Sequence, residues 1–217
     1  MSSFLGPDGH LMTALTKLGK LIFANLLWLL CCVPVITVVP ATTSFYYTVT
    51  KSIRRDCGYV AEEFFRSMQR TLKKGILFSI AGLLWGAALW YGRMYAVANE
   101  TEGFNFLLFA YDVLIAVSAC VASCLIPVFS RFEMKMTGIL KLSFVMAVRY
   151  IYYSALLVAG TVLVGWLVIV KLPMLCIVIL PGLWCYISTY FIERMLLAYM
   201  PPAGDDKDAW YREQKQS

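Results

Sequence analysis

The sequence predicts an all-α fold: a polytopic membrane bundle of about five transmembrane helices with two basic amphipathic interfacial helices. Of its 217 residues, 60% are hydrophobic and 15% are charged, whereas about 25% of residues are charged in soluble domains. The mean hydropathy is +0.72. Five uncharged stretches of 18 to 30 residues recur along the chain, and about 20 apolar residues suffice to cross a hydrocarbon core of about 30 Å.

The uncharged stretches place the transmembrane helices. Each predicted helix includes one stretch with its flanking residues, and the connections are too short to form a separate soluble domain. We therefore expect a single membrane domain over residues 1–217, ending in a polar tail at 201–217. The predicted spans are 18–39, 75–97, 106–130, 150–170 and 172–194.

Basic residues are distributed unevenly between the loops. Segment 51–74 holds seven Lys or Arg and segment 131–149 holds four, whereas 93–112 holds only Arg93. Short cytoplasmic loops collect basic residues, so both basic segments are expected in the cytoplasm. Five crossings then place the N-terminus outside and the C-terminus in the cytoplasm.

The first uncharged stretch leaves two interpretations open. Lys17 and Lys20 precede it, and a basic N-terminal flank favours the cytoplasm. The stretch is 30 residues long and contains Pro34 and Pro40, which break helices. In the simple interpretation, a helix crosses up to about residue 33 and residues 34–40 form an elbow. In the alternative, the stretch is re-entrant and both of its ends are cytoplasmic.

Both basic segments have amphipathic patterns. In 51–74, Val60, Phe64, Met68 and Leu72 recur every four residues, opposite a charged face, as in a helix lying at a membrane interface. Segment 131–149 repeats the pattern less regularly. The charged face of the first segment is a candidate cytoplasmic docking face, formed by Arg66, Arg70, Lys73 and Lys74.

Polar residues at membrane depth are the default functional candidates. Asp112 lies near the start of the third span, and Arg93 ends the second span on the same side, so a helix-locking pair between them is geometrically reasonable. Asn25 and Thr37 lie in the first segment, where they can satisfy backbone groups released by its prolines. Separate from these polar candidates are several glycines, which we expect to mark close helix packing: Gly82, Gly86, Gly160 and Gly165.

Signatures of enzymes and cofactors are missing from the sequence. It contains no H-E-x-x-H, G-x-S-x-G or G-x-x-x-x-G-K-[ST] motif, and His10 is its single histidine. Six of the seven cysteines fall in apolar spans and only Cys57 lies in a polar segment, so neither disulfides nor a zinc site is expected. We expect a protein that is not an enzyme, has no catalytic or metal-binding residues, and needs no cofactor.

Several short motifs resemble the YesL family of bacterial membrane proteins. They are Asn-Leu-Leu-Trp at 25–28, Pro-Val-Ile-Thr at 34–37, Pro-Ala at 40–41 and Pro-Val-Phe-Ser-Arg-Phe at 127–132. Val39 stands where that family would have glycine, and Leu142-Ser143 where it would have Asn-Ala. The resemblance implies a five-helix protein of the bacterial inner membrane, with genomic links to polysaccharide degradation and sugar-importing ABC systems.

Two functional hypotheses follow. The first is a non-enzymatic accessory to ABC-type carbohydrate uptake that docks through its basic cytoplasmic segments. The second is a small secondary transporter or channel in which Asp112 is the coupling carboxylate. The expected partners are membrane lipid, ABC permease subunits and a second copy of the chain, but not nucleic acid.

Overall fold

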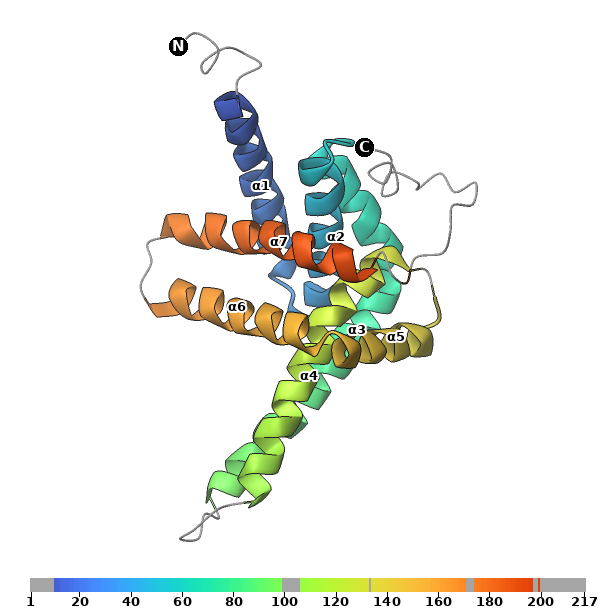
Figure 1. The fold of residues 1–217 in the computed structure, drawn as a ribbon, viewed down its shortest axis with the longest axis vertical. Coiled ribbons are helices and arrows are strands. Elements are labelled where there is room, and N and C mark those ends of the chain that lie inside the picture. Colours follow the sequence, from blue (N-terminus) through green and yellow to red (C-terminus); the bar gives the residue numbers. More distant parts are fainter. Residues whose placement is uncertain (1–9, 99–105, 133, 171–173, 197–198, 200–217) are drawn as a thin grey trace.

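The regular elements of the protein are helices throughout the part of the chain that the computed structural model describes, residues 10–98, 106–132, 134–170, 174–196 and 199. Figure 1 shows their arrangement. The elements are α1 (His10–Cys32), the 3₁₀-helix η1 (Val35–Thr37), α2 (Val38–Thr48), the π-helix η2 (Val49–Arg54), α3 (Val60–Ala98), α4 (Phe106–Arg131), α5 (Met136–Arg149), α6 (Ile151–Val170) and α7 (Met174–Leu196).

Four of the described helices are long and apolar enough to cross a membrane. They contain the candidate spans Met12–Cys32, Val60–Ala98, Phe106–Arg131 and Ile151–Val168. The fifth predicted span, 172–194, is helical as α7 from Met174, and residues 171–173 lie outside the described part. The polar tail at 201–217 also lies outside it.

The first segment folds back on itself, which differs from the predicted single span 18–39. Helix α1 ends at Cys32, and α2 returns towards the end at which α1 begins (Figure 1). Trp28 Nε1 donates to Thr42 Oγ1 at 3.2 Å, and the Trp28 ring stacks on Phe45 at a centroid distance of 5.6 Å. The prolines make the predicted elbow, but the hairpin extends over residues 10–54 and not only over the uncharged stretch.

Helix α2, which η2 continues, is enclosed by other helices. The residues of α2 and η2 are buried from Pro40 to Thr50 except Thr42, and they pack against α1, α3 and α4. Much of this surface is hydroxylic, yet the hydroxyls donate to carbonyl oxygens four residues earlier, as Ser44 does to Pro40 and Thr48 to Ser44, both at 2.8 Å. Satisfied hydroxyls are small and neutral enough to be buried, so neighbouring helices can approach α2 closely.

Helix α3 joins two elements that the sequence predicted separately. The helical part of segment 51–74 and the span 75–97 form one unbroken helix of 39 residues, about 58 Å long at 1.5 Å per residue. Its first half packs on α2. The stripe it buries there is more polar than predicted, because Glu63, Ser67 and Thr71 are buried, whereas Met68 and Leu72 are half-buried.

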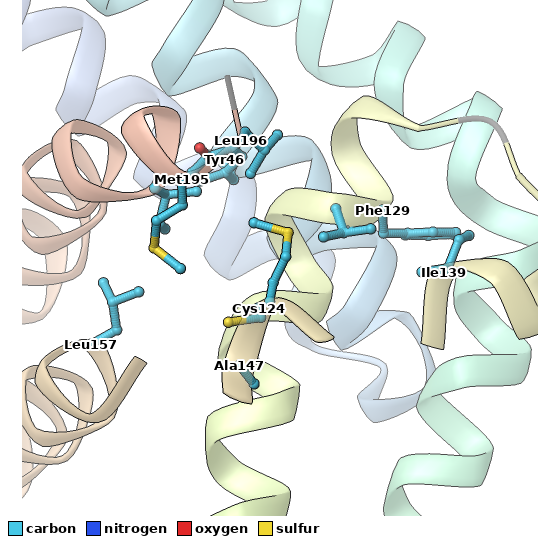
Figure 2. Close-up of a cluster of buried hydrophobic side chains, with 11 residues drawn as sticks. Tyr46, Cys124, Phe129, Ile139, Ala147, Leu157, Met195 and Leu196 are labelled. Atoms are coloured by element: carbon cyan, nitrogen blue, oxygen red, sulfur yellow. The ribbon is translucent and has the colours of Figure 1, made fainter. Parts of the chain in front are cut away.

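The α3–α4 hairpin extends away from the centre of the molecule. The α6–α7 hairpin runs across the direction of α3 and α4 (Figure 1). The bounds of α4 and α6 agree closely with the predicted spans 106–130 and 150–170, and α5 forms the predicted helix within 131–149. Figure 2 shows the cluster of buried side chains where α2, α4, α5, α6 and α7 meet. This cluster fixes the ends of both hairpins against α2.

Candidate functional site

A buried ionic cluster joins three parts of the fold around Glu193, near the end of α7. Arg131 Nη2 donates to Glu193 Oε1 at 2.7 Å. Arg54 Nη1 and Arg55 Nη2 donate to the other carboxylate oxygen at 3.1 and 3.2 Å. None of the four side chains is more than 15% exposed. We call these residues the Glu193 cluster.

Each arginine of the cluster lies at the end of a helix or directly after it. Arg54 is the last residue of η2, Arg55 follows it, and Arg131 is the last residue of α4. Arg54 Nη1 also donates to the carbonyl oxygen of Thr189 at 3.0 Å, and its guanidinium lies 4.2 Å from the ring centre of Tyr190. The carbonyl and the aromatic face both favour a cation, so α7 offers Arg54 three favourable contacts on successive turns.

The chemistry of the cluster is electrostatic. Moving charges out of water costs several kcal/mol per ion, and close opposite charges with hydrogen bonds are needed to offset that cost. In the sequence, Arg131 is 62 positions from Glu193 and Arg54 is 139 positions from it. The cluster therefore ties η2, α4 and α7 together at one end of the helices, and separating any of them would leave charge buried without its partner.

A second buried ion pair joins η2 to α3. Lys51 Nζ is 2.8 Å from Glu63 Oε2, with side chains that are 12% and 8% exposed, and it also donates to Tyr47 Oη at 3.3 Å. Burial lowers the pKa of Lys51, but the hydrogen bonds to Glu63 and Tyr47 outweigh it and raise the pKa overall. This pair fixes η2 against the beginning of α3.

The first half of α1 is attached to the turn between η2 and α3. Asp56 accepts from Lys20 at 2.8 Å and lies 3.5 Å from Lys17 Nζ. The hydrogen bond from Lys20 holds the pKa of the Asp56 carboxyl below its ordinary value. Asp56 has φ of 51° and Gly58 has φ of 83°, and these left-handed conformations suit aspartate and glycine.

These contacts decide how the first segment is folded. They place residues 17 and 20 beside the turn that begins the basic segment 51–74, so both ends of the α1–α2 hairpin lie at one end of the molecule. This is the arrangement of the re-entrant alternative. The simple interpretation expected an elbow at residues 34–40 followed by a loop, whereas residues 38–48 form a returning helix. Whether α1 crosses the membrane alone or the segment is re-entrant stays a prediction, since Met12–Cys32 is itself a candidate span.

The predicted Arg93–Asp112 pair forms. Arg93 Nε donates to Asp112 Oδ1 at 2.7 Å, joining α3 to α4 near the far end of their hairpin. The side chains are 37% and 46% exposed. Gly92, one residue before Arg93, faces the ring of Tyr111, at 2.5 Å from the position where a Cβ would stand. This arrangement fits a helix-locking role.

Asn25 and Thr37 lie where a structural role would place them. Thr37 Oγ1 donates to the carbonyl oxygens of Cys31 and Pro34, at 2.6 and 2.7 Å, and so satisfies backbone acceptors where α1 ends. Asn25 is fully buried within α1. The two residues lie on different elements of the hairpin, Asn25 in α1 and Thr37 in η1.

The predicted docking face lies on the outside of α3. Its four basic residues are exposed and recur at i, i+4, i+7 and i+8, which is one helix face. Lys74 Nζ donates to the carbonyl oxygen of Met134 at 3.3 Å. The basic face therefore extends to the residue that precedes Lys135 and α5.

The glycine predictions were only partly correct. Gly160 is in close contact with the Trp184 ring of α7, as expected for close packing, and Trp184 Nε1 donates to Thr161 at 3.2 Å. Gly82, Gly86 and Gly165 have open space around the position of a Cβ. Helix α3 instead packs closely at Gly75, where a Cβ would lie 2.8 Å from the ring of Pro40.

Within the described residues, no group of three or more His, Cys, Asp or Glu side chains is arranged to hold a metal ion. The six cysteines described there are free thiols. The seventh, at position 176, lies outside the residues whose side chains are described.

Sequence reasoning did not find the Glu193 cluster. Arg54, Arg55 and Arg131 were counted only as basic loop residues. A signal was present, because Arg131 and Glu193 are each the first charged residue after an uncharged stretch, and Glu193 has no basic residue three or four positions away on its own helix. A carboxylate in that setting needs a partner on another segment.

The helical fold and its apolar helices of spanning length define a polytopic helical membrane protein. A family model described as "Protein of unknown function, DUF624" matches residues 21–92, and YesL-like proteins belong to that family. The match covers 72 of 217 residues, from α1 into the second half of α3. No curated protein and no solved structure matches the chain.

Proposed function

We propose that the protein is a non-enzymatic, YesL-like accessory of a carbohydrate-importing ABC system in the bacterial inner membrane. The family match at 21–92 supports this kinship, since it contains the motifs at 25–28, 34–37 and 40–41. The C-terminus and the basic segments face the cytoplasm in this proposal, following the distribution of basic residues.

The observation that carries the proposal is the exposed basic face of α3. Arg66, Arg70, Lys73 and Lys74 are exposed on one side of the helix. Helix α3 is fixed against α2 through the Gly75–Pro40 contact and against η2 through the Lys51–Glu63 pair. A rigid helix that presents four positive charges suits an acidic surface on a partner, because complementary charge gives specificity and fast association. A permease subunit is the partner that the genomic context of the family implies.

The transporter alternative depended on Asp112 as a coupling carboxylate. Asp112 pairs with Arg93 and is nearly half exposed, so its geometry favours a structural contact. We therefore keep solute transport only as an outcome of the test below.

The experiment is affinity purification of the tagged protein from its native membrane, after growth on plant polysaccharide, with mass spectrometry of the proteins that co-purify. Recovery of ABC permease subunits is expected. Replacing Arg66, Arg70, Lys73 and Lys74 with glutamine should abolish it. The matched control replaces the exposed basic residues of α5, Lys135, Lys141 and Arg149, and should leave recovery unchanged.

Two outcomes would contradict the proposal. Purification without permease subunits would remove the accessory role. Solute flux in proteoliposomes that contain this protein alone would favour the transporter alternative, and flux lost in Asp112→Asn would assign the carboxylate to it.

A further inference from the structure

Helix α5 exposes an apolar side that no described part of the chain covers. It packs inwards through Ile139, Ser143, Met146 and Ala147. On the opposite side four large apolar side chains are exposed: Leu140 (44%), Phe144 (53%), Val145 (49%) and Val148 (59%). Their spacing of i, i+4, i+5 and i+8 puts them on one continuous helix face.

Basic side chains lie on and beside this apolar side, with Lys141 between Val145 and Val148 by helix register and Arg149 at one edge. Lys135, Lys141 and Arg149 are exposed along α5. The hydrogen bond from Lys74 to the carbonyl oxygen of Met134 brings another ammonium group to the beginning of the helix. An apolar strip with a basic border is the pattern of helices that lie in the boundary between headgroups and acyl chains, and the border favours anionic lipid.

The connections of α5 fix its depth. Four residues, 132–135, separate it from the end of α4, and only Tyr150 separates it from α6. Both neighbours are candidate membrane spans. A helix of 14 residues, about 21 Å long, that is joined so closely to two spans must remain at the membrane surface where those spans end.

The residues at both ends agree with this position. Lys135 and Tyr150 have non-helical backbone angles, so the chain changes direction on entering and leaving α5. Tyr150, Tyr152 and Tyr153 begin the next span, and Tyr152 is 88% exposed. Tyrosines concentrate at the level of the headgroups.

We propose that α5 is a membrane-surface helix whose exposed apolar side inserts into the headgroup boundary, where its basic border selects anionic phospholipid. The insertion is carried by Leu140, Phe144, Val145 and Val148. The selection is carried by Lys135 and Lys141, with Lys74 of α3 beside them. This inference does not rest on the proposed docking function, because it concerns the lipid contact of α5; Lys74 is the one residue that the two proposals share.

The test uses the full chain in vesicles of equal parts phosphatidylcholine and phosphatidylglycerol. The variant Phe144→Trp supplies a fluorescent reporter, and the emission of the wild-type protein is subtracted. Lipids brominated near the headgroup should quench the added emission more strongly than lipids brominated near the bilayer centre. Brominated phosphatidylglycerol should quench it more than brominated phosphatidylcholine.

Charge variants test the selection. Lys135→Gln with Lys141→Gln should lower the preference for phosphatidylglycerol about 25-fold, since each basic residue near an anionic leaflet strengthens binding about fivefold. Arg66→Gln with Arg70→Gln on α3 is the matched control and should leave the preference unchanged. Gln69→Trp, on the exposed polar side of α3, controls the reporter and should be quenched by aqueous iodide but not by brominated lipid.

The outcomes separate clearly. Quenching of Phe144→Trp by iodide alone would overturn the insertion. Equal quenching by both lipids, unchanged by the lysine substitutions, would overturn the anionic selection. If Phe144→Trp does not fold, Val148→Trp places the reporter on the same side of α5 with the same expectations.

Discussion

Arg131 and Glu193 are joined by a 2.7 Å hydrogen bond, and each is the first charged residue after an uncharged stretch of the chain. The bond connects the last residue of α4 to the last turn of α7. Arg54 and Arg55 bring η2 to the same carboxylate. The single carboxylate therefore holds three otherwise separate segments in place.

Neutralising this carboxylate should destabilise the protein strongly. Glu193→Gln keeps the shape of the side chain but removes the negative charge that pairs with three buried guanidinium groups. Breaking a buried ion pair from one side costs about 3–5 kcal/mol. The thermal midpoint of the purified variant in detergent measures the effect. Glu62→Gln, which removes an exposed carboxylate of α3, should change stability by less than about 0.5 kcal/mol. Equal effects of the two variants would show that the Glu193 cluster is not a structural centre.

The sequence predicted the elements that apolar stretches and their charged borders define. Helices α4 and α6 begin and end close to the predicted residues, because Arg131, Arg149 and the tyrosines at 150, 152 and 153 mark where apolar sequence stops and starts. The Arg93–Asp112 pair was also predictable, since both residues lie at the same end of consecutive spans.

The sequence did not predict the returning helix α2. Its threonines, Ser44 and Pro40 have low helix propensity. Only tertiary packing shows that these hydroxyls donate to carbonyls one turn earlier while α1, α3 and α4 surround them. The Glu193 cluster depends on that return, because η2 carries two of its arginines. The cluster was therefore missed for the same reason as the helix.

Adding one methyl group to α3 should have opposite effects at two glycines. In Gly75→Ala the new Cβ would lie 2.8 Å from the Pro40 ring, which is rigid and attached to the backbone of α2. Such overpacking typically costs about 1–3 kcal/mol. Gly86→Ala places the same group in open space and should stabilise the helix by up to about 1 kcal/mol. Thermal midpoints of both variants check this, and equal effects would argue against the close α2–α3 contact.

The Arg93–Asp112 pair should contribute little to stability. Both side chains are more than a third exposed, and exposed pairs contribute about 0–1 kcal/mol. Asp112→Asn should therefore lower the thermal midpoint only slightly. The charge swap of Arg93→Asp with Asp112→Arg should recover most of that loss, since it restores an ion pair between the same helices. If the double variant is less stable than either single variant, the Arg93–Asp112 ion pair does not connect α3 and α4.

The ion pairs of Asp56 should make stability depend on acid pH. The pKa of Asp56 in the folded protein is lower than the ordinary value near 3.8, so its contribution is present above that value and is lost as the pH falls through the folded pKa. Asp56→Asn removes the charge, and asparagine tolerates the left-handed backbone at this position. The difference in thermal midpoint between wild type and variant should be constant near neutral pH and vanish in acid, once the Asp56 carboxyl is protonated in the folded protein as well. High salt should also reduce it. A difference that persists in acid and in salt would point to a backbone effect.

The same ion pairs predict which parts of the chain share a side of the membrane. Lys17 and Lys20 contact Asp56, so an exposed position near the start of α1 and one in the following turn should face the same compartment. In a background with the native cysteines replaced, Met12→Cys and Tyr59→Cys should react with an impermeant maleimide from one side of oriented vesicles. Tyr91→Cys should react only from the other side, because 32 positions along α3 correspond to about 48 Å.

The labelling pattern distinguishes the two interpretations of the first segment. If α1 and α2 form a hairpin, positions 12 and 59 change sides together when the vesicles are inverted. If α1 crosses alone, they label from opposite sides, and Lys17 and Lys20 cannot reach Asp56 in the membrane. The second result would also remove η2 from the end of the molecule where Arg54 and Arg55 meet Glu193, so the Glu193 cluster and the fold of the first segment depend on each other.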